Sequence, residues 1–359
     1  DLLKIVIASK GGAIQHVELK NYKTSDGHPL VLNNGDSAEF SFNFFSENRM
    51  IATKDLYFNL PDKGIKVTGN DSQTVALRLP AGNNQFIEYQ YSLKGNDYMV
   101  VNFINMEGLI ASNAGYMELN WKQKLLQQEK SHQNESAVST IYYRYTDEEV
   151  DHLSEAHDDG TELKTKVQWV GFKQQYFSSV LIADKAFESP TKINSTVLPE
   201  QGAVRFMQAN FTIPFSHNNS ESTALKFYYG PNHYQTLKKY HLGLEKLVPL
   251  GWGIFGWVNR FAVIPVFNFL NSFDINYGII ILILTILIKV VLLPLTFKSY
   301  MSTAKMKVLQ PEMAELQAKY KEEPMKLQQE MMTLYRKAGV NPLGGCFPML
   351  LQMPILIAM

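Results

Sequence analysis

The segment Ile275–Phe297 constrains this chain more than any other. Its 23 residues contain one charged side chain, Lys289. As an α-helix they would extend about 34 Å, which is enough to cross the roughly 30 Å hydrocarbon core of a bilayer. We therefore predict a transmembrane helix over residues 274–297.

Cations flank this segment unequally. The twenty residues before it hold Arg260 as their only Lys or Arg, whereas Lys298, Lys305 and Lys307 follow it closely. Residues 298–341 carry eight Lys or Arg and five Asp or Glu. Because cytoplasmic loops of membrane proteins are rich in Lys and Arg, we predict that residues 298–341 are cytoplasmic. The long region before the helix then lies on the opposite side of the membrane.

Residues 1–235 show the alternation of apolar and polar side chains that is typical of half-buried strands. Phe86–Leu93 and Tyr98–Met106 flank a Gly- and Asn-containing turn at residues 94–97, which predicts a β-hairpin. Many short strands separated by turns indicate an all-β domain of the sandwich type. Further strands are predicted at Ile14–Leu19, Glu39–Phe45, Val75–Leu79, Tyr116–Trp121, Thr140–Tyr145 and Ala224–Tyr229.

The composition gives little support for catalysis or cofactor binding. Lys plus Arg and Asp plus Glu both number 34, so the charge gives no argument for a nucleic-acid partner. The single cysteine, Cys346, excludes an internal disulfide framework. The acidic stretch 146–163 fits no calcium or zinc pattern, and we interpret it as a solvated loop or a short exposed helix. We predict no enzyme activity, no metal and no cofactor.

Residues 236–273 are predicted to form a linker followed by an amphipathic helix. The stretch Gly251–Phe273 is rich in aromatic residues but is interrupted by Arg260 and Pro265. Trp252 and Trp257 suit a helix that lies in the headgroup layer, with ring bodies in the apolar phase and N–H groups in water. The alternative is a helix that crosses the membrane completely.

A polar stripe runs along the predicted transmembrane helix. Thr285 lies four residues before Lys289 and Thr296 seven residues after it, so the three share one face. A lysine near the centre of such a helix costs about 2.5–3.5 kcal/mol on insertion scales, which favours a wet cavity beside it. In the alternative interpretation, Lys289 reaches along the helix toward the cytoplasmic headgroups.

Residues 298–341 are predicted to form a helical hairpin, with Pro324 opening its second helix. Methionine is concentrated from residue 298 onward, where nine of the chain's 14 Met occur. Flexible, polarizable side chains suit a surface that accepts different partners, although ordinary packing between two helices explains them equally. The apolar positions of the hairpin include Met306, Leu309, Met313, Met332 and Tyr335.

A second apolar run, Leu343–Met359, follows the hairpin. Its 17 residues are about the minimum for crossing a membrane. We expect residues 342–359 to be the start of the next transmembrane helix, truncated by the end of the chain. If the β region is outside the cytoplasm, a segment that carried it across the membrane is expected before Asp1.

Several motifs together resemble the YidC family of membrane-protein insertases. One stretch of this chain resembles the start of the family's second core span: Asn341-Pro342-Leu343-Gly344-Gly345-Cys346-Phe347-Pro348 followed by Gln352-Met353-Pro354. Other matching motifs are Pro294-Leu295-Thr296, Lys305-Met306 with Leu309-Gln310-Pro311, Gln329-Glu330-Met331-Met332, Trp169, Lys173-Gln174-Gln175-Tyr176-Phe177 and Tyr229-Gly230-Pro231. The similarity is dense over residues 250–359 and sparse but ordered over residues 1–240.

The resemblance implies an insertase and chaperone of the bacterial inner membrane. Such a protein receives nascent membrane proteins from the ribosome, alone or with the Sec translocon, and contacts membrane lipid. The family's N-terminal domain in Gram-negative bacteria is a periplasmic β-supersandwich. Two other functions stay open on the residues alone: a channel or transporter subunit with a β sensor domain, and a membrane-anchored carbohydrate-active enzyme.

The resemblance also implies a hydrated, positively charged groove within the membrane. Lys289 occupies the place of the family's groove cation, with Thr285 one turn before it. Many members carry arginine there, and lysine offers a point charge in place of a bidentate fork. Gln352, Met353 and Leu356 match positions that line the groove from the facing span. The hairpin matches the region that receives substrate, ribosome or targeting factors.

Overall fold

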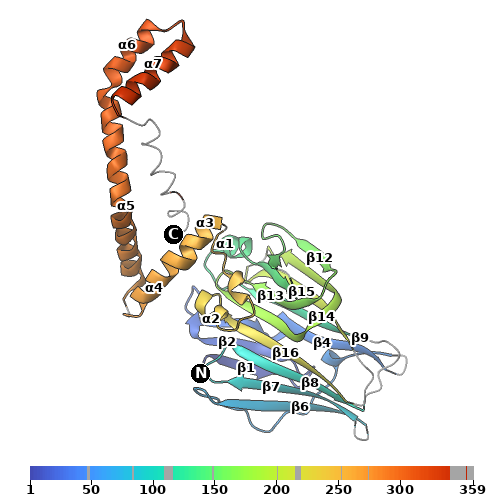
Figure 1. Ribbon diagram of the computed structural model, residues 1–359. Coiled ribbons are helices and arrows are strands. Elements are labelled where there is room, and N and C mark those ends of the chain that lie inside the picture. The colour runs from blue at the N-terminus through green and yellow to red at the C-terminus, as the bar shows by residue number, and fades with distance from the viewer. Residues whose placement is uncertain are drawn as a thin grey trace. The chain divides into compact units, whose positions relative to one another are not determined.

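The computed structural model describes residues 1–46, 49–82, 85–108, 116–147, 149–199, 201–214, 220–251, 253–273, 275–339 and 353. The chain divides into two compact units, Asp1–Val248 and Pro249–Met359. The first is built almost entirely of strands and the second of helices (Figure 1). A large β-rich domain followed by a helical region was predicted from the sequence, and the structure confirms it.

The β-rich unit contains a three-stranded and a 13-stranded sheet. In the three-stranded sheet, β2 lies between β1 and β3. The strands are β1 (Leu3–Ile7), β2 (Ile14–Lys23), β3 (Pro29–Asn34), β4 (Ala38–Ser46), β5 (Arg49–Ala52), β6 (Ser72–Gly82), β7 (Gln85–Lys94), β8 (Met99–Glu107), β9 (Tyr116–Leu126), β10 (Thr140–Tyr145), β11 (Val150–His152), β12 (Asp159–Leu163), β13 (Val167–Lys173), β14 (Phe177–Val197), β15 (Ala203–Pro214) and β16 (Ser220–Pro231).

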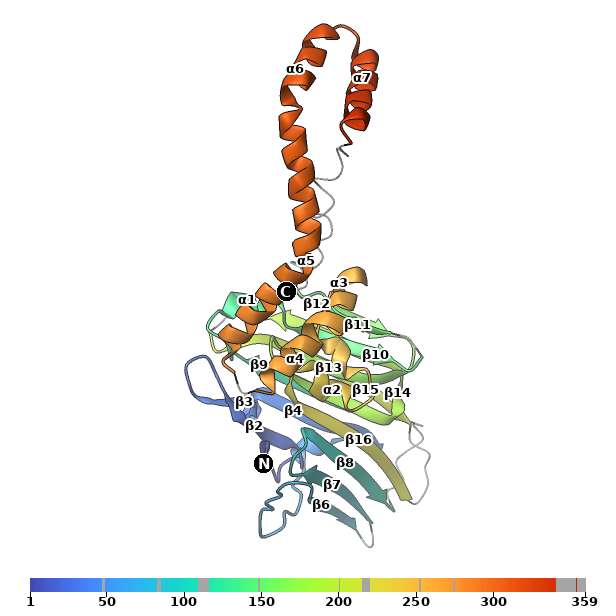
Figure 2. The same ribbon diagram turned by 60° about the vertical axis from the view of Figure 1, so that its left-hand side comes forward.

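Strand β14 belongs to both layers of the large sheet. Its first part, Phe177–Ala183, pairs with β16 and β13 in the layer that continues through β8 and β7 to β6. Its last part, Glu188–Val197, pairs with β15 in the layer that continues through β9 to β4. Strands β6, β7, β8 and β16 lie side by side in Figure 2. One 21-residue strand therefore joins the two layers.

Aromatic side chains fill the space between the layers. Phe40 of β4 meets Phe227 of β16 edge to face at 5.1 Å between ring centroids. Trp121 of β9 stacks on Phe172 of β13 at 3.8 Å. All four rings are buried, and burial of a side chain of this size stabilises the fold by roughly 1.5–3 kcal/mol. The alternation that predicted the strands thus places one face of each layer in a shared core.

The three-stranded sheet is tied to the same core by hydrogen bonds from buried polar side chains. Gln123 of β9 donates its Nε2–H to the carbonyl oxygen of Leu32 at 3.1 Å. Tyr91 of β7 donates its hydroxyl to the carbonyl oxygen of Gly12 at 2.9 Å. Short helices complete this unit: η1 (Gly35–Ser37), η2 (Thr53–Asp55), α1 (His132–Ala137), α2 (Tyr234–Lys238) and η3 (Leu244–Leu247).

The predicted strands and the hairpin of β7 and β8 are confirmed, but the interpretation of the acidic stretch 146–163 is wrong. It contains β11, paired with β10, and β12, paired with β14. The buried Arg205 guanidinium fixes the intervening loop by donating to the carbonyl oxygens of Glu155 and His157. Asp158 accepts from the backbone N–H of Val197 at 2.7 Å. These contacts come from distant residues, so the local composition did not predict them.

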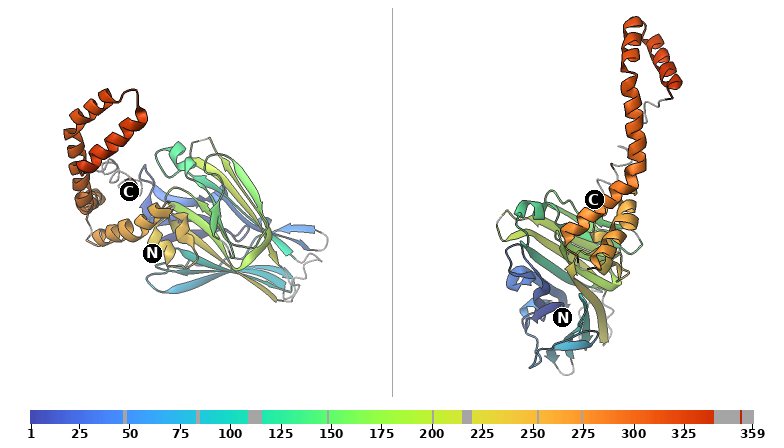
Figure 3. Two further views of the ribbon diagram at one scale, coloured as in Figure 1. Left: turned by 45° about the horizontal axis from the view of Figure 1, so that its top comes forward. Right: turned by 90° about the vertical axis from the view of Figure 1, so that its left-hand side faces the viewer.

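The second unit consists of consecutive helices. They are α3 (Gly253–Val258), the π-helical turn η4 (Asn259–Val263), α4 (Ile264–Asn271), α5 (Tyr277–Val308), α6 (Gln310–Lys319) and α7 (Pro324–Lys337). Helix α5 continues beyond the predicted end at Phe297, because the Lys, Ser and Met residues that follow are compatible with a helix. Figure 3 shows α6 and α7 folding back on each other beyond α5.

Candidate functional site

The candidate site lies on α5. The Asn276 side chain begins this helix by accepting a hydrogen bond from the backbone N–H of Gly278 at 2.9 Å. The stretch Tyr277–Pro294 is long and apolar enough to cross a membrane, and so is Gly253–Asn271. The structure therefore contains two candidate membrane helices among the residues it describes.

One face of α5 packs against the helices before it. Ile280, Leu284 and Leu292 are buried on this face, and Phe267 of α4 stacks on Tyr277 with ring centroids 6.1 Å apart. An apolar cleft of about 220 Å³ separates the helices, and sequence reasoning did not anticipate it. The cleft is lined by Val258, Ala262, Val263, Val266, Leu284, Leu287, Ile288, Val291 and Leu292.

Lys289 lies on a different face of α5. It follows Leu284 by five residues, which places it about 140° around the helix from that buried position. Its side chain is exposed within the described residues. The packing of α4 thus leaves the Lys289 side chain uncovered, together with those of the neighbouring Ile286 and Val290.

The threonines of the predicted stripe are bonded to their own helix. Thr285 donates its hydroxyl to the carbonyl oxygen of Ile281 at 2.8 Å. Thr296 donates to the carbonyl oxygens of Leu292 and Leu293, next to Pro294, which has no N–H. Because each hydroxyl proton is used internally, these side chains offer a ligand mainly acceptor lone pairs.

The aromatic segment before α5 is a continuous helix in spite of Pro265. The π-helical turn η4 ends two residues before this proline, where the missing N–H disturbs the regular hydrogen-bond pattern. Asn259 donates its side-chain amide to the carbonyl oxygen of Leu250 at 2.9 Å. Trp257 and Phe261 are exposed, and both an interfacial position and a full span fit this helix.

The hairpin brings two of its predicted residues together. The Tyr335 hydroxyl of α7 lies 3.6 Å from Met313 Sδ of α6. Met306, Leu309 and Met313 are half-buried, whereas Met332 is exposed. Of the predicted residues of the facing span, Gln352 and Leu356 lie outside the described residues, and the Met353 side chain is exposed. The structure thus describes the α5 side of the site.

The β-rich unit holds buried charges with structural partners. Lys173 donates to the carbonyl oxygen of Val138 at 2.8 Å and lies 3.6 Å from a Glu155 carboxylate oxygen. Burial lowers the pKa of Lys173, and the nearby Glu155 opposes this effect. Within the described residues, no three His, Cys, Asp or Glu side chains are grouped as a metal site requires.

Comparison with known proteins places the chain in a family. The model described as YidC periplasmic domain matches residues 1–262, and the model described as 60Kd inner membrane protein matches residues 269–359. A protein of Parabacteroides distasonis named membrane protein insertase YidC is 42% identical and covers 100% of this chain and 58% of its own length. The chain belongs to the YidC family. A Bacteroides fragilis relative with the same name is 38% identical over 100% of this chain and 59% of its own length.

The two YidC family models match consecutive parts of the chain. The periplasmic-domain model covers the β-rich unit and continues into the first apolar helix, and the inner-membrane-protein model covers the helix Tyr277–Val308 and the residues after it. The chain spans 58–61% of the length of YidC relatives. A galactose mutarotase related enzyme of Lactobacillus acidophilus gives a TM-score of 0.37 at 9% identity, covering 64% of this chain and 95% of that one. This similarity is too low to bear on the function of a YidC protein.

Proposed function

We propose that this chain is part of an insertase that inserts inner-membrane proteins and assists their folding through a hydrophilic, positively charged groove. The observation that carries the proposal is the exposed Lys289 in the middle of an apolar helix. Full-length relatives named as insertases support the functional class.

The physical argument starts from the cost of charge in lipid. Lys289 would cost about 2.5–3.5 kcal/mol at the centre of a lipid-exposed helix. Water beside the ammonium removes much of this cost and lowers the local barrier for a hydrophilic tail. An acidic tail gains attraction to the cation, and the apolar segment behind it supplies the favourable transfer into lipid.

The second wall of the groove is assigned to residues 342–359, with Gln352, Met353 and Leu356 facing Lys289 and Thr285. A polar amide opposite the cation suits water and polar tails. Met353 and Leu356 suit the apolar part of a substrate, because flexible apolar side chains adapt to many sequences. The α4 side of α5 is already packed, so the facing span belongs on the Lys289 side.

The proposed orientation follows from charge. Residues 298–341 have three more cationic than anionic side chains, from eight minus five, and are placed in the cytoplasm. The β-rich unit is then periplasmic. The exposed Met332 and the cations of the hairpin form the surface that we assign to nascent chains, the ribosome or the Sec translocon.

The test replaces Lys289 in the full-length protein reconstituted in lipid vesicles. Lys289→Ala should reduce the insertion of a substrate with an acidic translocated tail by about tenfold, and Lys289→Glu should reduce it further through repulsion. Val290→Ala, a neighbouring change on the same helix, serves as the control. Protease protection of the translocated tail measures insertion.

A substrate whose tail acids are replaced by amides separates the groove from general damage to the protein. Its insertion should depend much less on Lys289. Unchanged insertion of the acidic substrate by both Lys289 variants would contradict the groove role. Ion conductance of the vesicles without substrate would favour the channel alternative.

A further inference from the structure

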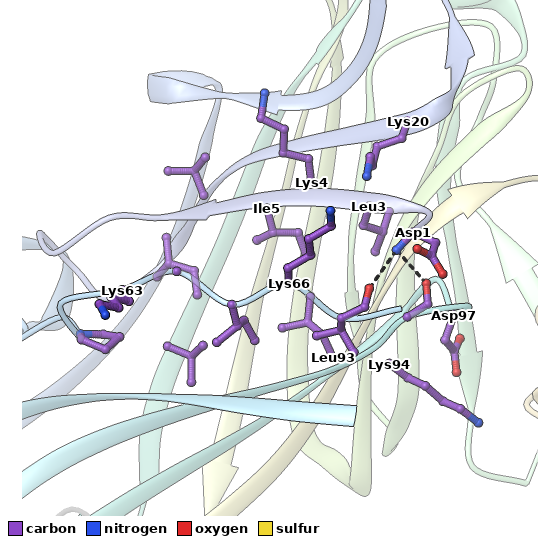
Figure 4. Close-up of a pocket in the computed structure, with 18 of the residues that line it drawn as sticks. Asp1, Leu3, Lys4, Ile5, Lys20, Lys63, Lys66, Leu93, Lys94 and Asp97 are labelled. Carbon is purple, nitrogen blue, oxygen red and sulfur yellow. Dashed lines mark hydrogen bonds between the residues drawn. The ribbon is translucent and has the colours of Figure 1, made fainter. Parts of the chain in front are cut away.

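The β-rich unit contains a cleft that the insertase proposal does not use. Its volume is about 470 Å³, within the range of specific ligand sites. Strand β1 forms one wall, Val75, Leu77 and Leu93 of β6 and β7 form the apolar floor, and residues 60–67 form the rim. Figure 4 shows these segments and the lysines around them.

The edge of β1 faces this cleft. All five residues of β1, Leu3–Ile7, line it, although successive side chains of a strand point to opposite faces. A wall made by consecutive residues is therefore the strand's edge. Among the described residues, β1 pairs with β2 alone, so its other edge is available.

The register identifies the backbone groups on that edge. The carbonyl oxygen of Leu2 accepts a hydrogen bond from the N–H of Lys20 in β2. Bonding alternates along an antiparallel strand, so Lys4 also directs its backbone groups to β2, opposite Glu18. Leu3 and Ile5 direct their N–H and C=O groups to the open edge. These groups are a template for one more strand.

Lysines surround the cleft, both on the rim at residues 60–67 and on the neighbouring strands, and we call them together the lysine rim. Lys4, Lys20, Lys63, Lys66 and Lys94 line the cleft, and Lys4 is paired with Glu18 at 3.2 Å. Among the described residues, no ion pair is formed by the other four. In Figure 4, Lys66 points toward β1, whereas Lys94 points away from it. Two acidic side chains, Asp1 and Asp97, also line the cleft.

We propose that this cleft binds an extended acidic peptide segment of another polypeptide, which adds as a strand to the free edge of β1. Its backbone pairs with Leu3 and Ile5. Its apolar side chains face the floor formed by Val75, Leu77 and Leu93, and its carboxylates face the lysine rim. The inference is independent of the groove around Lys289.

The strand edge is the reason for choosing a peptide over a lipid. An acyl chain with an anionic head would use the apolar floor and the lysines, but it would leave the backbone groups of β1 unpaired. Peptide recognition by strand addition obtains affinity from main-chain hydrogen bonds and specificity from alternate side chains. Both kinds of contact are present in this cleft.

The test uses the full chain in lipid nanodiscs and a fluorescein-labelled peptide of about eight residues in which Glu and Val alternate. Fluorescence anisotropy should show saturable binding that weakens with salt. A peptide with Lys in place of Glu should not bind. Methylation of the amide nitrogens along one edge of the peptide should abolish binding, whereas methylation along the other edge should preserve it.

Variants of the protein test the rim. The double variant Lys63→Glu, Lys66→Glu should raise the dissociation constant by at least about tenfold. Lys185→Glu is the matched control, because Lys185 is an exposed lysine of β14 that does not line the cleft. Equal melting temperatures of the two proteins would establish that both are folded.

Four results would overturn the proposal. One is equal binding of the basic and acidic peptides. Another is binding that is insensitive to methylation on either edge, and the third is displacement of the peptide by laurate at the peptide's own affinity, which would indicate a lipid cleft. Binding that the Lys63 and Lys66 changes leave intact would place the peptide elsewhere on the molecule.

Discussion

Glu135 is an acidic side chain enclosed within the β-rich unit. Its carboxylate accepts hydrogen bonds from the backbone N–H groups of Gln128 and Glu129 and from the side-chain amide of Gln174. Burial raises the pKa of Glu135, and the backbone hydrogen bonds oppose the shift. The raised pKa means that the folded protein binds this proton more tightly than the unfolded chain does.

The proton on Glu135 links stability to pH. Its stabilising contribution is complete below the unfolded-state pKa of roughly 4.3 and is lost as the pH rises through the higher folded-state value. Relative to Glu135→Gln, which does not titrate, the wild-type protein should therefore lose stability as the pH rises through this window. Urea unfolding, followed by the fluorescence of the buried Trp121 and Trp169, measures the difference.

The slope of that difference with pH has a ceiling of about 1.4 kcal/mol per pH unit. Any hydrogen-bond defect of the glutamine variant shifts the curve without changing its slope. If the stability of the wild-type protein relative to Glu135→Gln stays constant or increases as the pH rises, burial does not dominate the pKa of Glu135.

Single residues differed in how far the sequence predicted them. Lys289 could be singled out because a charge inside an apolar run is visible from local spacing, and its role stays a prediction. The structural role of Glu135 could not be found, because its partner Gln174 is 39 residues away. The groove itself remains a prediction, since Gln352 and Leu356 lie outside the described residues.

The turn between β7 and β8 was predicted from the sequence, but its contact with another segment was not. Its Gly and Asn residues predicted the hairpin, but they did not predict that the turn supports the rim of the cleft. A Cβ atom on Gly95 would overlap the backbone of Thr68 and lie 2.7 Å from the nitrogen of Gly69. The backbone that follows residues 60–67 therefore rests directly on this glycine.

Gly95→Ala should accordingly destabilise the β-rich unit by about 1–3 kcal/mol, because backbone atoms have to move. It should also increase hydrogen exchange in residues 60–71. Gly64→Ala is the matched control, since nothing lies within 4 Å of its added Cβ. Urea unfolding and exchange mass spectrometry test both variants, and equal behaviour of the two would contradict the close contact.

The positions of the strands could be predicted from the sequence more readily than the strands with which they pair. Period-two alternation identified β7, β8 and β16 from local sequence. It could not show that β14 pairs with β16 and β15 in succession, since register depends on residues far apart in the chain. The acidic stretch 146–163 failed for the same reason, because Arg205 organises it from outside.

For the whole molecule, the charge distribution predicts which side of the membrane each unit occupies. A variant with Cys346→Ala removes the chain's only cysteine, after which single cysteines report their side. Lys185→Cys in the β-rich unit should react with an impermeant maleimide in spheroplasts. Lys319→Cys in α6 should react only in inverted vesicles. Labelling of both cysteines from the same side would refute the assigned topology.

Strand β14 has a mechanical consequence for the β-rich unit. If one layer separates from the other, the hydrogen bonds of one half of β14 break while its other half stays paired. Neither layer can therefore unfold independently of the other. Loss of packing near Phe187, which contacts Phe211 at 4.0 Å between ring centroids, would propagate in both directions along the backbone. A mechanical force applied to either layer is therefore opposed by the hydrogen bonds and packing of the whole β-rich unit.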